Sequence, residues 1–201
     1  MRRLIFAMTL AIASTGLTAA GPQRPAEFNA SDKADLDRVS AYLNSIHTMR
    51  GGFVQIGPEG QVDQGKFYIL KPGKMRFDYD PPNPTLVICD GLSIAVYNTK
   101  LNTANRYPES STPLNILLSD HVDLKRNEAV VGVEHQSGEL IVSARSNDRR
   151  VTGNITIVFS EPTLELRQWT IVDAQSLPTT VSLRNAQTGV DLPDAAFKIT
   201  R

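Results

Sequence analysis

The chain has a single cysteine, Cys89, among 201 residues, and aromatic residues make up only 6% of it. One cysteine cannot form an internal disulfide, so we expect the fold to be held together by its apolar core. Cys89 ends the apolar run Leu86–Cys89. Because a reactive thiolate needs an electropositive and partly open setting, we interpret Cys89 as a buried structural thiol.

Charge of one sign is not in excess either: 21 Lys and Arg stand against 21 Asp and Glu. A basic patch is the usual mark of a nucleic-acid-binding protein, so the composition argues against nucleic acid as a partner. It also argues against electrostatic docking on anionic lipid.

Motifs of common catalytic sites are missing. The sequence has no G-x-S-x-G elbow, no Walker loop and no G-x-G-x-x-G. Three histidines lack the HxxxH or HxH spacing of a zinc site: His47, His121 and His135. Asp78, Asp80 and Asp90 resemble a carboxylate cluster, but Asp80 and Asp90 each begin a turn, where aspartate is common for backbone reasons. We therefore expect a binding protein with no metal and no cofactor, and not an enzyme.

Residues 1–20 have the pattern of a signal peptide. Arg2 and Arg3 precede an apolar run over Leu4–Ala13, which is too short to span a membrane, and small residues follow up to Ala20. Cleavage after Ala20 predicts an exported, periplasmic protein with 19 basic and 21 acidic residues, a net charge of about −2. The residue directly after that point is Gly21 and not a cysteine, so we do not expect this chain to carry a lipid anchor. We expect residues 21–30 to be a flexible lead and residues 31–201 to form one domain.

An amphipathic helix of about sixteen residues is predicted after Ser31, which is a suitable N-cap. Its apolar face repeats at helical spacing and consists of Leu36, Val39, Leu43 and Ile46. Gly51-Gly52 is expected to end it. A second, short helix is predicted where Thr112 precedes Pro113, as a cap and a first helical residue.

The rest of the chain has the pattern of short strands separated by Gly, Pro and Asp-Gly turns. The predicted strands are Phe53–Ile56, Lys66–Leu70, Lys74–Tyr79, Thr85–Cys89, Ile94–Tyr97, Thr103–Tyr107, Ala129–His135, Leu140–Ala144, Asn154–Phe159, Leu164–Val172 and Thr179–Arg184, with a possible edge strand at Phe197–Ile199. About eleven strands with two helices indicate a mainly β (α+β) fold, built as an antiparallel sheet, barrel or sandwich.

Several strands alternate between apolar and polar residues, which places their apolar side chains on one face. In Lys74–Tyr79 that face holds Met75, Phe77 and Tyr79. The same alternation fits an ordinary packed core and a ligand cavity, so the pattern alone leaves both open.

The ordered motifs resemble the outer-membrane lipoprotein carrier family, the LolA-like periplasmic chaperones of Gram-negative bacteria. The resemblance runs from about Asp35 to Ile199. It rests on an amphipathic helix followed by Gly52-Phe53-Val54-Gln55, Gly65–Pro72, Met75–Tyr79, Leu86–Gly91, Val96-Tyr97-Asn98 and Thr112-Pro113-Leu114.

The resemblance implies an incomplete antiparallel β-barrel with an apolar concave face, covered by the N-terminal and middle helices. The implied acyl-chain cavity is lined by Phe53, Phe67, Ile69, Met75, Phe77, Val87, Ile94 and Val96. The implied lid residues are Leu36, Val39, Leu43, Leu114, Leu117 and Leu118. Whether Val87 or Ile88 faces inward is left open by the pattern.

One residue departs from the family. Familiar members have an arginine before the proline of the second strand motif, thought to hold the lid shut, and here that residue is Lys71. Lysine lacks the planar fork of arginine. The resemblance assigns the lid latch to Lys71.

The function implied is a monomeric carrier that binds the acyl chains of lipoproteins released from the inner membrane and delivers them to the outer membrane. Its implied partners are acylated lipoproteins, an ABC-type lipoprotein-releasing transporter of the inner membrane, and an outer-membrane acceptor or the membrane itself. Two alternatives stay open: the same fold carrying or sensing another lipid or glycolipid, and an enzyme acting on amphiphiles through Asp78, Asp80 or His135.

Overall fold

The computed structural model describes residues 27–109, 112–145 and 153–199. The predicted signal peptide, its cleavage after Ala20 and most of the predicted lead lie outside these residues. Among the described helices, none is long and apolar enough to cross a membrane.

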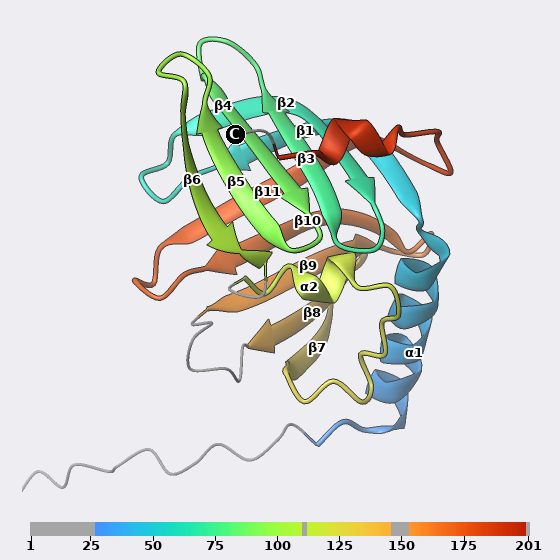
Figure 1. Cartoon of the computed structure of the whole chain (residues 1–201). Helices are drawn as coiled ribbons and strands as arrows, with labels where there is room; N and C mark the ends of the chain where they lie inside the picture. The colour runs from blue at the N-terminus through green and yellow to red at the C-terminus, as the bar shows by residue number, and fades with distance from the viewer. Residues whose placement is uncertain (1–26, 110–111, 146–152, 200–201) are drawn as a thin grey trace, which may run out of the picture.

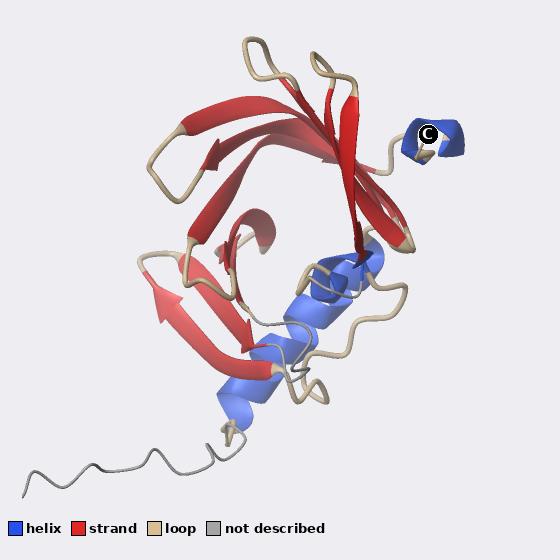
Figure 2. Ribbon diagram, turned by 60° about the vertical axis from the view of Figure 1, so that its left-hand side comes forward, coloured by secondary structure: helices blue, strands red, loops and turns tan. Residues whose placement is uncertain are grey.

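Eleven antiparallel strands form one sheet, in the order β6-β5-β4-β3-β2-β1-β11-β10-β9-β8-β7. The strands are β1 Thr48–Ile56, β2 Val62–Leu70, β3 Lys74–Tyr79, β4 Thr85–Asp90, β5 Ser93–Asn98, β6 Thr103–Pro108, β7 Val130–Gln136, β8 Glu139–Arg145, β9 Asn154–Ser160, β10 Glu165–Val172 and β11 Pro178–Thr188. The sheet curls round on itself without closing (Figure 2). The single unclosed sheet confirms the predicted incomplete barrel and excludes a sandwich of two sheets for the described strands.

Two α-helices accompany the sheet: α1 (Ala30–Ser45) and α2 (Asn115–Leu118). The long helix α1 crosses the open side of the curled sheet, and α2 lies beside its C-terminal half (Figures 1 and 2). The covered concave face predicted from the sequence is therefore present.

Helix α1 begins at Ala30, two residues earlier than predicted, and its N-cap is Asn29 rather than Ser31. The Asn29 side chain accepts a hydrogen bond of 2.9 Å from the backbone N–H of Asp32, whose carboxylate accepts one of 3.0 Å from the N–H of Asn29. Such a capping box satisfies two backbone donors that a helix start leaves unpaired. The reciprocal pair fixes the start at Asn29.

The expectation that Gly51-Gly52 ends the helix is wrong. Helix α1 ends at Ser45, and both glycines lie within β1. A Cβ atom on Gly51 would lie 2.7 Å from the carbonyl oxygen of Arg184 and 2.8 Å from the ring of Phe67. The glycine is required because β11 and a buried aromatic ring approach it closely, next to a bulge in the β1–β11 pairing.

Two further expectations need correction. Phe197–Ile199 is not a strand: Asp194–Phe197 forms the 3₁₀ helix η2, which follows Pro193 and packs against β3 and β4 on the outside of the sheet.

Helix α2 starts at Asn115 and not at Pro113. The hydroxyl of Thr112 still accepts a hydrogen bond of 3.3 Å from the N–H of Leu114, so it orders the turn that precedes the helix.

Candidate functional site

The inner face of the curled sheet is apolar, and strand register shows why. Phe67 pairs with Phe77, Phe77 with Val87, and Val87 with Val96, so a row of side chains crosses four strands on one side. Directly opposed residues of antiparallel strands point to the same face. This register places Val87 inward, whereas Ile88 pairs with Arg76 and faces outward. The question left open by the sequence is thereby answered for this strand.

Aromatic rings fill the middle of this face. The ring of Phe53 meets the rings of Phe77 and Tyr79 edge to face, with centroids 5.0 Å apart in both pairs. Edge-to-face pairs of this kind add to the stabilisation that burial gives. The Tyr79 hydroxyl donates a hydrogen bond of 2.7 Å to the side-chain oxygen of Gln55, which satisfies its polar end.

Every residue predicted to line the cavity lies in or against one apolar cluster. Six of them are buried: Phe53, Phe67, Ile69, Met75, Phe77 and Ile94. The other two, Val87 and Val96, are partly buried and pack against the cluster. The structure brings this set together on the concave face.

The sequence reasoning overlooked the other half of the same face. Strands β8, β9 and β10 contribute fully or nearly fully buried inward side chains: Leu140, Val142, Ile155, Ile157, Phe159 and Trp169. The signal was available, because apolar residues alternate in Leu140–Ala144 and Asn154–Phe159. The interior is thus lined from both halves of the chain.

The helices cover this interior with the predicted lid residues. Leu36, Val39 and Leu43 of α1 are at most 2% exposed, and they belong to the same cluster as the sheet residues. Leu117 and Leu118 of α2 belong to it as well, and Leu114 packs against it. The lid and the concave face therefore form one continuous apolar region.

Polar contacts fasten the lid at a few points. The ammonium of Lys71, just after β2, donates a hydrogen bond of 3.0 Å to the carbonyl oxygen of Leu43. That carbonyl is near the end of α1, where cations are favoured, and it also accepts a hydrogen bond of 3.3 Å from the N–H of Ile46. The N–H of Gly73, in the same turn, donates a bond of 2.8 Å to the carbonyl oxygen of Leu118 in α2. The β2–β3 turn thus contacts both helices.

The loop between α2 and β7 is tied to α1. Asn44 donates to the carbonyl oxygen of Val122 at 2.9 Å and accepts from its N–H at 2.8 Å. The hydroxyl of Ser40, which is buried, accepts a bond of 3.0 Å from the N–H of Leu124. Lys125 of the same loop also forms an ion pair of 2.7 Å with Asp37 of α1. Helix α1, helix α2 and this loop therefore form one unit over the interior.

Burial is the main electrostatic influence on Lys71. It lowers the pKa of the Lys71 ammonium, and the nearby carboxylate of Asp120 opposes this effect. A half-buried ammonium with one carbonyl partner is a weaker fastening than a bidentate arginine. The contact therefore joins the β2–β3 turn to α1 through one hydrogen bond.

Three residues considered for chemistry, Asp78, Asp90 and Cys89, have structural surroundings in the fold. Asp78 lies on the outer face and forms an ion pair of 2.8 Å with Arg76. The carboxylate of Asp90 accepts bonds from the N–H groups of Leu92 and Ser93, as a turn residue does. Cys89 is buried, and burial raises the pKa of its thiol. Within the described residues, no group of His, Cys, Asp or Glu side chains is arranged to hold a metal ion.

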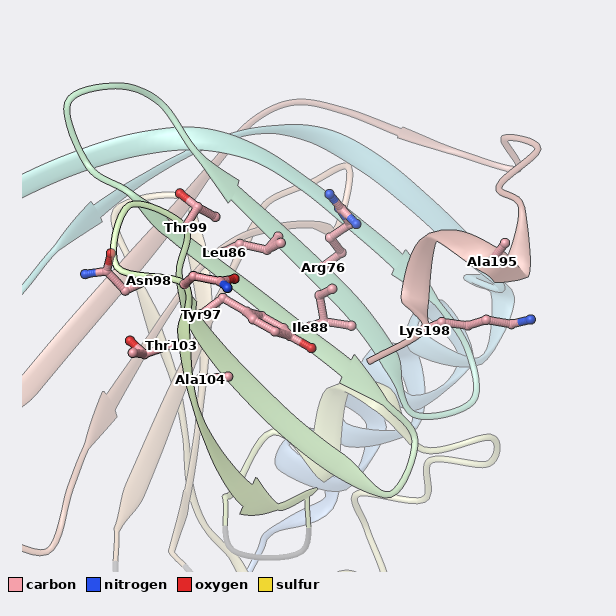
Figure 3. A pocket seen from close by; sticks show the side chains of 11 residues that line it. Arg76, Leu86, Ile88, Tyr97, Asn98, Thr99, Thr103, Ala104, Ala195 and Lys198 are labelled. Atoms are coloured by element: carbon pink, nitrogen blue, oxygen red, sulfur yellow. The ribbon is translucent and has the colours of Figure 1, made fainter. Parts of the chain in front are cut away.

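A separate hollow of about 590 Å³ lies on the outer face, beside η2 (Figure 3). Its floor includes Leu86, Ile88 and Tyr97, and Arg76 and Lys198 stand at its side. The sheet separates it from the apolar interior, because Leu86 and Ile88 alternate with the inward Val87.

These features define a class: a curled antiparallel sheet with an apolar concave face beneath a helical lid. The family model for the outer membrane lipoprotein carrier protein LolA matches residues 44–200. The chain belongs to this family.

Curated proteins named as outer-membrane lipoprotein carriers match this chain at low sequence identity. An outer-membrane lipoprotein carrier protein of Cupriavidus pinatubonensis is 26% identical over 181 residues, which covers 83% of this chain and 84% of the relative. One of Methylococcus capsulatus is 32% identical over 99 residues, 45% of this chain and 47% of the relative. This chain thus spans about half the length of the first relatives that it matches.

Solved structures support the fold alone. A DUF1329 family protein from Desulfovibrio piger superposes with a TM-score of 0.51 at 14% identity, covering 84% of this chain and 96% of that one. An uncharacterized conserved protein from Thermus thermophilus superposes with a TM-score of 0.50 at 13% identity, covering 85% and 94%.

Proposed function

We propose that this chain is a periplasmic carrier that binds the acyl chains of lipoproteins released from the inner membrane and delivers them to the outer membrane. The observation that carries the proposal is the continuity of the apolar concave face with the apolar faces of α1 and α2. A hydrophobic surface closed by helices, and fastened to them by a few polar contacts, opens by moving the helices and leaves the sheet intact. Membership of the lipoprotein carrier family supports the same cargo.

In this mechanism the lid residues leave the interior when acyl chains enter. Leu36, Val39 and Leu43 are exchanged for acyl methylenes, so the apolar lining stays covered in both states. Opening breaks the hydrogen bond between Lys71 and Leu43, which we assign as the latch. Its geometry, a single bond to one carbonyl, suits a latch that is made and broken repeatedly.

Magnitudes favour a pliable site over a tight one. Burial of a methylene contributes about 0.8 kcal/mol, so the roughly forty methylenes of three acyl chains amount to on the order of 30 kcal/mol against water. Noncovalent affinities saturate near about −20 kcal/mol. The carrier therefore only has to match a membrane closely enough for transfer to be reversible. Met75, an adaptable side chain in the lining, suits that demand.

The partners follow from this cycle. An ABC-type transporter of the inner membrane supplies the energy that loads the carrier, and an outer-membrane acceptor or the membrane itself receives the cargo. The carrier acts as a monomer, without a cofactor and without catalysing a reaction. The second candidate is the same cavity carrying another lipid or glycolipid, since acyl chains alone decide what the apolar lining recognises.

Native mass spectrometry tests the proposal. The mature chain is isolated from the periplasm of its host, and we expect a one-to-one complex with triacylated protein. Free lipid or glycolipid in that place would support the second candidate instead. Failure to carry any amphiphile, together with failure to release lipoproteins from spheroplasts, would contradict both.

A matched pair of variants locates the site. Val96→Glu places a charge on the half-buried inner face, and we expect it to abolish cargo binding because an unpaired charge is costly in an apolar cavity. Val62→Glu is the control, because Val62 is 67% exposed. Circular dichroism verifies that both variants fold. Equal binding by the folded variants would remove the cavity from the mechanism.

A further inference from the structure

Four ionisable side chains join the N-terminal half of α1 to the far part of the sheet. Asp35 and Arg38 belong to α1, His135 to β7, and Glu161 to the turn between β9 and β10. Arg38 donates to Asp35 at 2.8 Å and to Glu161 at 3.2 Å. His135 lies between the same two carboxylates. We refer to these four residues as the α1 clasp.

The geometry of His135 favours the doubly protonated ring. Its Nε2 is 2.8 Å from a carboxylate oxygen of Asp35, and its Nδ1 is 2.8 Å from one of Glu161. Ionised carboxylates only accept hydrogen bonds, and a neutral imidazole has one N–H and one lone pair. Both contacts are therefore satisfied together only when the ring carries two protons and a positive charge.

The electrostatics agree with this geometry. The hydrogen bonds to Asp35 and then to Glu161 raise the pKa of His135, while its small desolvation opposes them. In turn, the hydrogen bond from His135 is the main cause that lowers the pKa of the Glu161 carboxyl, with Arg38 adding to it.

Loss of the proton has a defined consequence. A neutral ring turns one lone pair toward a carboxylate oxygen, so one of the two links breaks. Asp35 is only 6% exposed, and little water is available to replace a lost donor there. Arg38 keeps its bonds to both carboxylates, so the clasp is weakened and not abolished.

We infer that the α1 clasp is a pH-sensitive fastening of the lid, closed while His135 is charged and loosened when it is neutral. The inference rests on the proposed function in that α1 serves as the lid. Because the pKa of His135 is higher in the closed state, the clasp contributes fully at pH values below the pKa of the open state. That contribution is lost as the pH rises through the raised pKa.

Hydrogen–deuterium exchange of the empty chain tests the inference. We expect the protection of amides 33–40, corrected for the intrinsic pH dependence of exchange, to fall several-fold between pH 5.5 and pH 8. His135→Gln is expected to show the lower protection at both pH values. His121→Gln, a change at another exposed histidine outside the clasp, should behave as the unaltered chain does.

A second measurement makes the test quantitative. NMR titration gives the pKa of His135 in the folded chain. Each pKa unit by which it exceeds the open-state value corresponds to a tenfold change in the equilibrium constant for opening. Glu161→Gln should lower that pKa. A protection profile in the unaltered chain that does not change with pH, or the same fall in His135→Gln, would overturn the inference. No cargo takes part, so failure of the carrier function leaves this result unaffected.

Discussion

The indole ring of Trp169 meets the ring of Phe77 edge to face, with centroids 6.2 Å apart. Phe77 belongs to β3 and Trp169 to β10, so this contact spans the interior between strands that are not neighbours in the sheet. The side chain of Trp169 is in the apolar cluster that the lid covers, and the residue is only 3% exposed. The contact therefore links the two halves of the apolar interior.

Trp169 is the only tryptophan of the chain, so fluorescence reports on this one place. We expect blue-shifted emission from the empty protein, because the indole is shielded from water. A long-chain amphiphile should change the emission saturably as acyl methylenes replace the lid side chains. A short-chain analogue of the same headgroup is the control. Emission that stays constant while mass spectrometry detects the bound amphiphile would place the cargo elsewhere.

Replacing Lys71 by methionine should loosen α1. The variant loses the hydrogen bond to the Leu43 carbonyl, and hydrogen bonds to charged groups contribute about 1.5–3 kcal/mol to stability. Part of this loss is regained, because a half-buried ammonium no longer has to be desolvated. We expect a decrease of about 1 kcal/mol in the free energy of unfolding in guanidinium, and faster loading with amphiphile. Lys66→Met, on the exposed side of β2, is the control. A latch role is excluded if Lys71→Met leaves both stability and loading at the control values.

The two glycines of β1 offer a matched comparison. Gly51→Ala drives a methyl group against the Arg184 carbonyl and the Phe67 ring, and overpacking of this kind costs about 1–3 kcal/mol. Gly52→Ala meets its nearest atoms at 3.7 Å, an ordinary contact, so its effect should stay within about 1 kcal/mol. Thermal unfolding of the two variants distinguishes them. Equal melting temperatures would contradict the close approach at Gly51.

Tyr79 should be the last tyrosine to ionise. Burial, assisted by the charge of Asp63, raises the pKa of Tyr79 to about 12, although the hydrogen bond to Gln55 opposes the shift. Ultraviolet titration of the folded chain should therefore show one of its five tyrosines ionising near that pH. The neutral form is favoured, so this residue destabilises the fold as the pH rises above the ordinary tyrosine value. Tyr79→Phe should remove the late step; its persistence would assign the step to another tyrosine.

Alternation predicted the sheet well because the period of two follows directly from strand geometry. Met75 and Phe77 face inward and Arg76 outward, as Lys74–Tyr79 indicated. The fold class was predictable for the same reason. The prediction for Gly51-Gly52 was wrong because a glycine pair resembles a helix stop. The glycine at position 51 is required instead by a close contact with β11, which no local sequence pattern shows.

The candidate site was predicted only in part. The inward residues of β2–β5 follow from alternation and family motifs, but Trp169 enters the interior through strand pairing that the sequence does not display. The α1 clasp was equally hidden. Asp35 and His135 are a hundred positions apart, and ion pairs across such separations leave no spacing signal.

The pairing of β1 with β11 has a consequence for assembly. Strands β1–β6 and β7–β11 are each a simple meander, and β1 joins them by lying beside the last strand of the second one. Met49 pairs with Thr188 and Ile56 with Thr180, so this seam brings together the most distant parts of the sheet. Contacts of long sequence separation slow folding. The concave face is therefore completed late, and neither meander holds a whole cavity until the seam has formed.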